Sequence, residues 1–175
     1  MNNKIKLFFY ITISSFFYFT TLFSENVYFI DVSKVLNQSK AGAEAQNNLK
    51  IKFETESKKF NQQEENLRKE EAELISQKKA ISGEDYQKKV NELRKKVANL
   101  QNDKQKSLND IARSRAKAKQ ELLKNLNPIL KKYMEENDIR LIIEKQSVVL
   151  GDTALEISDK IIEILNKELS SIKIN

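Results

Sequence analysis

Residues 81–100 read ISGEDYQKKVNELRKKVANL, and this stretch decides the fold. Gly83 predicts the end of one helix and a turn within 82–84. After the turn, apolar residues return at alternating spacings of four and three, which is the pattern of a helix that packs along one seam against another helix. The residues with this spacing are Tyr86, Val90, Leu93, Val97 and Leu100, and the row continues with Leu108 and Ile111.

The residues before the turn supply the other half of a coiled coil. One apolar residue recurs every seven positions at Phe53, Phe60, Leu67, Leu74 and Ile81. If the chain reverses near residue 82, the residue numbers of facing pairs sum to 164, as for Leu67 with Val97 and Phe60 with Lys104. We therefore predict an antiparallel helical hairpin over 40–125, with helices of about 40 residues and ~60 Å each. One apolar row per heptad is a thin seam, so we expect a flexible arm.

Short β-prone runs flank this arm at 27–32, 139–144 and 147–150, and they predict three strands. The arm would then be inserted in a small head made of 25–39 and 126–175, which gives an α+β fold that is mostly α. A head this small, with no disulfide and with open sheet edges, is expected to assemble with copies of itself. The candidate residues for the head core and for contacts between copies are Val27, Phe29, Ile30, Leu141, Ile142, Ile143, Val148 and Leu150.

Helix caps complete the prediction for the head. Ser33 is expected to begin a short helix that reaches about residue 38, and Ser158 to begin a closing helix with a buried stripe that includes Ile161 and Leu165. Asn127 followed by Pro128 predicts a kink or a helix restart, because proline is favoured at the first position of a helix.

Composition excludes most enzyme classes. The 175 residues contain no Cys and no His, so thiol nucleophiles, Cys/His zinc sites and a histidine base are absent. Three Gly and one Pro are too few for a turn-rich β-sandwich or a glycine-loop nucleotide site. Adjacent carboxylates such as Glu64 and Glu65 do not face each other on a helix, and Asp152 lacks the spacing of a calcium loop. We expect no catalysis, no cofactor and no metal.

The N-terminus resembles an export signal. Lys4 and Lys6 precede an apolar run over 7–23 that ends at Ser24, which predicts a secretory signal peptide over 1–24 and an exported protein. The run is shorter than a usual membrane span, yet an uncleaved inner-membrane anchor stays open as the alternative. Without Cys, the chain cannot be a lipoprotein.

Charge is divided unevenly along the chain. The formal net charge is +6, of which the arm over 40–125 contributes +7 and the mature head −3. A basic arm attracts acidic unfolded chains over about a Debye length, ~8 Å at physiological salt. The hypothesis that the arm binds such chains rests on its net charge. For any single basic residue, the favoured interpretation is that it only keeps one face of the helix soluble. The candidate contact residues are Lys88, Lys89, Arg94, Lys95, Lys96, Arg113, Arg115, Lys117 and Lys119.

The apolar N-terminal segment and the basic charge are also compatible with two other functions. A retained N-terminal segment would make the protein a coiled-coil spacer anchored in the inner membrane. A basic chain could also bind nucleic acid, but Lys outnumbers Arg 26 to 5 and the arm has few aromatic residues for base stacking. Nucleic acid is therefore not an expected partner, and contact with an anionic membrane surface is left open.

The head segments resemble the Skp/OmpH family of periplasmic chaperones, and the likeness covers nearly all of the mature chain. It is carried by VYFIDVSKVL at 27–36, SKAG at 39–42, DIRLII at 138–143, VVLGD at 148–152 and LEISDKII at 155–162. The chain departs from the family pattern at Glu156 and Ser158, where Asp and Thr are usual, and at Leu150, where an aromatic residue is common.

The resemblance implies a homotrimer in which three heads form a body and three arms surround a central cavity. In that family the cavity holds unfolded outer-membrane proteins on their way to the outer membrane and prevents their aggregation, without consuming ATP. The expected partners are thus unfolded outer-membrane β-barrel proteins and two further copies of the chain.

Overall fold

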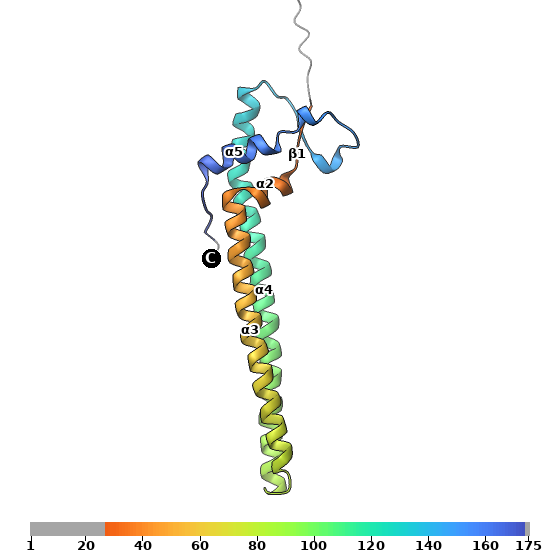
Figure 1. Cartoon of the computed structure of the whole chain (residues 1–175), viewed down its shortest axis with the longest axis vertical. Coiled ribbons are helices and arrows are strands. Elements are labelled where there is room, and N and C mark those ends of the chain that lie inside the picture. Colours follow the sequence, from red (N-terminus) through yellow and green to blue (C-terminus); the bar gives the residue numbers. More distant parts are fainter. Residues whose placement is uncertain (1–26, 174–175) are drawn as a thin grey trace, which may run out of the picture.

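The structure is a computed structural model that describes residues 27–173, and it consists of a long two-helix arm with a small head at one end (Figure 1). The predicted signal peptide over 1–24 lies outside the described residues. The mostly helical fold with a small pair of strands is the fold class predicted from the sequence. The elements follow the chain as β1 Tyr28–Ile30, α2 Val32–Gln38, α3 Lys40–Gln77, α4 Gly83–Glu136, β2 Ile142–Glu144, two single-turn 3₁₀ helices Lys145–Ser147 and Thr153–Leu155, and α5 Ser158–Glu168.

Serine caps begin both helices of the arm. The Ser39 hydroxyl accepts a hydrogen bond from the amide of Gly42 at the start of α3, and the Ser82 hydroxyl accepts one from the amide of Asp85 at the start of α4. Gly83 is therefore the first residue of α4, and its interpretation as the terminator of the preceding helix was wrong. The turn lies just before Gly83. The Ser82 hydroxyl binds a free amide of the first turn and so begins α4 at this point, which a glycine without a side chain cannot do.

Helix α4 is continuous from the tip of the arm into the head. The predicted helix restart at Asn127 and Pro128 was wrong, because Pro128 lies inside the helix, and the alternative of a kink there stays a prediction. Proline removes one backbone hydrogen bond, at a cost of about 3 kcal/mol. Leu122, Leu126 and Ile129, each at most 4% exposed, anchor the same stretch in the core while Pro128 itself is exposed. Their burial offsets the lost hydrogen bond.

The sheet has two parallel strands, β1 and β2, with Tyr28 opposite Ile142 and Ile30 opposite Glu144. On its other edge β1 forms a single bridge, in which Phe29 lies opposite Glu156. The third strand predicted over 147–150 was wrong for the single chain. Ser147 ends a 3₁₀ turn there, since the amide of Val148 binds the carbonyl of Lys145. This local turn satisfies the backbone without a strand partner.

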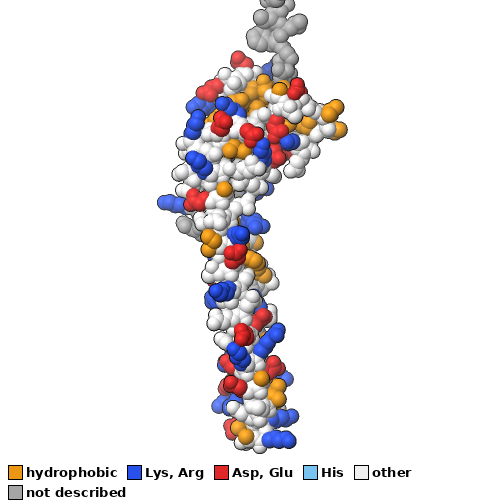
Figure 2. All heavy atoms as spheres, in the orientation of Figure 1, with side chains coloured by type: hydrophobic (Ala, Val, Ile, Leu, Met, Phe, Trp, Pro, Cys, Tyr) orange, Lys and Arg blue, Asp and Glu red, His pale blue; other side chains and the backbone are white. Residues whose placement is uncertain are grey.

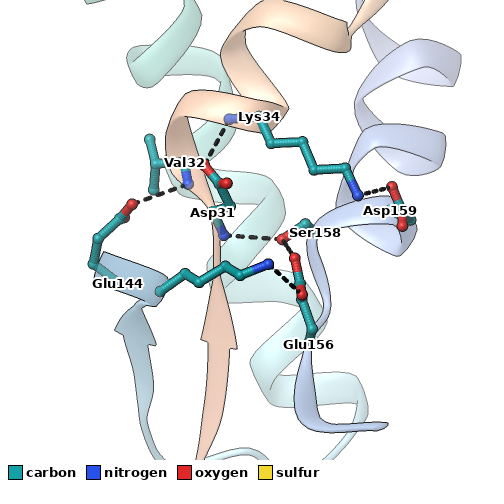
Figure 3. A network of polar contacts seen from close by, with 8 residues as sticks. Asp31, Val32, Lys34, Glu144, Glu156, Ser158 and Asp159 are labelled. Atoms are coloured by element: carbon teal, nitrogen blue, oxygen red, sulfur yellow. Dashed lines mark hydrogen bonds and ion pairs between the residues drawn. The ribbon is translucent and has the colours of Figure 1, made fainter. Parts of the chain in front are cut away.

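A polar network joins the two chain segments of the head (Figure 3). The buried Ser158 hydroxyl accepts a hydrogen bond from the amide of Asp31 at 2.9 Å and donates one to Glu156 at 2.9 Å. Glu156 also pairs with Lys145 at 2.8 Å, and Lys34 pairs with Asp159 at 2.6 Å. Segments more than 100 residues apart in sequence are thereby held together beside the strands.

Two predicted helix caps have other roles in this network. Asp31, and not Ser33, caps α2, because its carboxylate accepts the amide of Lys34 at 2.7 Å while Ser33 already lies inside the helix. Ser158 is the first residue of α5 and makes no cap hydrogen bond, since its hydroxyl is engaged with Asp31 and Glu156. Sequence pattern finds a cap residue but cannot see a distant partner that takes the same hydroxyl.

The core of the head is mostly helical. Val35 and Leu36 of α2 pack with the base of α4 and with the predicted stripe of α5, and Figure 1 shows α5 crossing α4 near the top of the arm. The buried members are Ile30, Val35, Leu36, Ala41, Leu122, Leu126, Ile129, Ile157, Ile161 and Leu165. Most of them lie on helices, so the predicted emphasis on strand residues missed the larger part of this core.

The eight candidate head residues divide between core and surface. Phe29 and Ile30 are buried, and Ile142, Ile143 and Val148 are half-buried. The three that lie exposed are Val27, Leu141 and Leu150. The role of the exposed residues in contacts between copies stays a prediction.

The junction of α2 and α3 leaves no room for a side chain at Gly42. A Cβ atom there would lie 1.7 Å from the backbone carbonyl oxygen of Leu36, whereas one at Gly83 would meet nothing within 4 Å. We predict that Gly42→Ala lowers the free energy of unfolding by about 3 kcal/mol, because backbone must move. The matched Gly83→Ala should raise it by up to about 1 kcal/mol, since alanine favours the helix. Urea unfolding followed by circular dichroism measures both, and equal stability of the two variants would contradict the close approach.

The network predicts a dependence of stability on pH. The Lys145 and Ser158 hydrogen bonds lower the pKa of Glu156 below its ordinary value of 4.5. A carboxylate with a lowered folded pKa stabilises the fold above pH 4.5, and this contribution is lost as the pH falls through the lowered pKa. Glu156→Gln should therefore lower the urea midpoint at pH 7 and have a smaller effect at pH 3. Glu168→Gln, at the exposed last residue of α5, should change neither midpoint appreciably.

Candidate functional site

The seam between α3 and α4 buries few side chains. Between residues 50 and 117, the buried apolar side chains are Phe60, Leu74 and Leu100. Phe53, Val97 and Leu108 belong to the predicted seam rows but are 46%, 43% and 49% exposed. A narrow seam cannot enclose every residue of its heptad rows, so these side chains lie at its edge. The arm thus exposes apolar surface that a fully formed coiled coil would bury.

The middle of the seam contains a polar bridge. Phe60 and Lys104 line the same hollow, as the predicted register requires. The Lys104 ammonium forms a salt bridge with Glu64, and this hydrogen bond lowers the pKa of the Glu64 carboxyl. On the other side the Lys59 ammonium lies 5.5 Å from the centre of the Phe60 ring. The Phe60 ring therefore lies close to the Lys59 cation and shares a hollow with Phe53 and Lys104.

The two long sides of the hairpin differ in chemistry. On one side, which we call the ionic flank, charged and amide side chains face each other across the helices. Lys89 donates to Gln77 at 3.1 Å, and Lys96 pairs with Glu70 at 2.6 Å. Two hollows on this flank are lined mainly by polar residues: Glu70, Glu73, Leu74, Gln77, Lys89, Glu92, Leu93 and Lys96 near the tip, and Lys52, Glu56, Lys59, Phe60, Gln63, Asp103, Lys106, Ser107 and Asp110 near the middle.

The opposite side carries a furrow made of three hollows in succession. They measure about 340, 210 and 480 Å³ from the base of the arm toward the tip. Apolar residues of both helices form much of the lining, and basic residues lie among them. The main lining residues are Leu36, Leu49, Arg115, Lys119 and Leu122 at the base, Phe53, Phe60, Lys104, Leu108 and Ile111 in the middle, and Leu67, Arg68, Arg94, Val97 and Leu100 toward the tip. We call this side the furrow flank.

The nine basic residues predicted as contacts are all exposed but do not form one cluster. Lys89 and Lys96 lie on the ionic flank, where both are engaged with side chains of α3. Three lie on the furrow flank, namely Arg94, Arg115 and Lys119. The remaining four line none of these hollows: Lys88, Lys95, Arg113 and Lys117.

Sequence reasoning missed Arg68 and the exposed apolar side chains that accompany it on the furrow flank. Net charge was the only signal used, and net charge does not distinguish the sides of a helix. Counting 100° per residue from the seam would have placed Arg68, Arg94 and Val97 on the same side. Figure 2 shows apolar side chains exposed between charged ones along the arm.

Comparisons with known proteins agree with this architecture. The sequence profile of the family described as outer membrane protein (OmpH-like) matches residues 26–165. The chain belongs to the OmpH-like family. A crystal structure of a candidate outer membrane chaperone (OmpH-like) from Caulobacter crescentus CB15 superposes with a TM-score of 0.80 at 16% sequence identity. The match covers 85% of this chain and 88% of that one, so the two share the fold. No curated protein sequence matches this chain.

Three further features of the described surface of this OmpH-like chain concern metal ligands, membrane spans and exposed apolar residues. Within residues 27–173 there is no group of three or more acidic side chains close enough to hold a metal ion. Over the same residues, no helix has the length and hydropathy of a membrane span. In the described part of the head, the exposed large apolar residues are Val27, Leu141, Val149 and Leu150, the last two being 102% and 93% exposed.

Proposed function

We infer that this protein is a periplasmic chaperone that binds unfolded outer-membrane proteins, here called clients, and prevents their aggregation without ATP. The observation that carries this proposal is the arm. It is a long, exposed hairpin with a net charge of +7 that leaves apolar side chains at the edge of its seam. Membership of the OmpH-like family and the fold shared with a candidate outer membrane chaperone support a chaperone role. In this proposal residues 1–24 are the signal peptide that directs export.

The proposed working form is a trimer joined through the head, residues 25–39 and 126–175, with the arms of 40–125 around a shared cavity. Within the described chain, β2 pairs only with β1, so its outer edge is open to another strand. Val149 and Leu150 project from the loop after β2 with almost complete exposure. Open strand edges and exposed apolar loops both favour association. Three basic arms would enclose a space that attracts acidic polypeptide and in which the arms repel one another.

The proposal is tested by diluting an unfolded outer-membrane β-barrel protein from urea into buffer with the mature chain, residues 25–175. Light scattering should show suppressed aggregation in the absence of nucleotide. Raising the salt from 50 to 500 mM should weaken client binding several-fold, because salt screens attraction to the +7 arm. Unchanged aggregation would overturn the proposed function, and salt-independent binding would show that charge does not drive capture.

Assembly through the head is tested by Leu150→Asp. We predict that light scattering gives three times the chain mass for the native protein and the mass of a single chain for this variant, because a buried, unpaired carboxylate would oppose association. Ile51→Asp provides a matched control, since Ile51 is an exposed apolar residue of the arm. It should leave the trimer intact. A native monomer, or a trimer that tolerates Leu150→Asp, would contradict this arrangement.

A further inference from the structure

The two flanks of the arm differ in the side chains that are available to bind a polypeptide. On the ionic flank, Lys89, Lys96 and their partners on α3 already satisfy one another. On the furrow flank, the exposed Phe53, Val97 and Leu108 have no comparable partner and together line the middle and outer hollows. A client that docks near the tip of the ionic flank must break these two contacts, whereas the furrow offers unpaired apolar surface.

The cations of the furrow are also of a particular kind. The chain has only five arginines, and three of them, Arg68, Arg94 and Arg115, line this side of the arm. Arg68 and Arg94 come from opposite helices and line the same hollow as Leu67 and Val97. Neither forms a salt bridge within residues 27–173. Guanidinium groups are weakly hydrated, lie flat against apolar and aromatic surfaces and bind carboxylates in pairs, so they suit a mixed apolar and acidic ligand.

The length of the stretch of α3 with exposed large apolar residues on this side indicates the shape of the ligand. The exposed apolar residues of α3 on this side begin at Phe53 and end at Ile75, which follows Arg68 by seven residues and so lies on the same face. Twenty-two helical residues extend ~33 Å. An extended chain rises about 3.3 Å per residue, so about ten residues span this distance. A transmembrane β-strand has about 9 to 11 residues and alternates apolar with polar side chains.

We propose that the furrow flank, and not the ionic flank, is the surface that holds clients, and that it takes one extended strand segment of about ten residues. Apolar side chains of the segment pack on the seam edge at Phe53, Leu67, Val97 and Leu108, and its acidic side chains pair with Arg68 and Arg94. The Lys104–Glu64 bridge crosses the furrow at mid-length and separates two apolar subsites. This assignment rests on the proposed chaperone function and specifies which face of the arm performs it.

Matched pairs of substitutions test the assignment. Arg68→Gln with Arg94→Gln removes two charges from the furrow, and Lys52→Gln with Lys106→Gln removes two from the ionic flank, at exposed residues without a salt bridge in the described chain. Binding of a fluorescent, urea-unfolded β-barrel protein measures Kd, and circular dichroism verifies that each variant keeps its helix content. The furrow pair should raise Kd by about fivefold or more, since three arms act together, and the control pair by less than about twofold.

A third variant tests the apolar part of the surface. Val97→Ser with Leu108→Ser keeps the charge unchanged and should also raise Kd by about fivefold or more, with weaker dependence on salt than the arginine pair. Equal effects of the furrow and ionic pairs would overturn the assignment while leaving the chaperone function in place. Absence of client binding by the native protein would instead overturn the function itself, so the two failures are distinguishable.

Cross-linking identifies the occupant directly. The photoreactive residue p-benzoylphenylalanine is placed at position 97 in the furrow or at position 106 on the ionic flank, and the trimer is irradiated with and without client. Cross-links to the client from position 97 and few from position 106 are expected. Cross-links from position 97 to a second copy of the chain, unchanged by client, would show that the furrow is an interface between arms and would overturn the assignment.

Discussion

The structure depends on the closure of the head from the two ends of the described chain, residues 27–173. Val35 and Leu36, which precede the arm, share a core with Ile161 and Leu165, which follow it. The arm can extend into solvent only because this packing fixes the residues at its base. Closing so long an insertion costs chain entropy that grows slowly with length, so the insertion can be long without undoing the core. The buried hydroxyl of Ser158 adds direction to this apolar contact, because it binds the Asp31 amide at one geometry.

The arm has the opposite character, since little holds it together except regular helix and a narrow seam. Phe60, Leu74 and Leu100 are widely spaced, and Lys104 occupies a position where a coiled coil would place an apolar residue. Better packing would make a stiffer hairpin but would bury Phe53, Val97 and Leu108. The same residues therefore leave the seam incomplete and the furrow exposed. The same residues that weaken the arm are those available to a ligand.

The sequence alone predicts the hairpin well, because heptad spacing is a local pattern that tertiary contacts reinforce. It predicts the head less well, where local and distant interactions compete. Proline normally breaks a helix, yet α4 passes through Pro128 because Leu126 and Ile129 are buried beside it. Ser158 looks like a helix cap until Asp31, 127 residues earlier, takes its hydroxyl. For the candidate site, the net charge of the arm can be counted from the sequence. Which basic residues lie on which flank can be known only once the pairing of α3 with α4 is known.

The close contact of Gly42 with the Leu36 carbonyl has a mechanical consequence. A joint with so little free space and a serine cap resists bending, so we expect the arm to behave as an elastic beam clamped at one end. The deflection of such a beam under thermal forces is small near the clamp and increases steeply toward the free end. In the proposed trimer, three beams clamped side by side would enclose a container with a rigid neck and a compliant mouth. Its capacity would adjust to the size of its contents by bending distributed along the helices, with no rearrangement of the head.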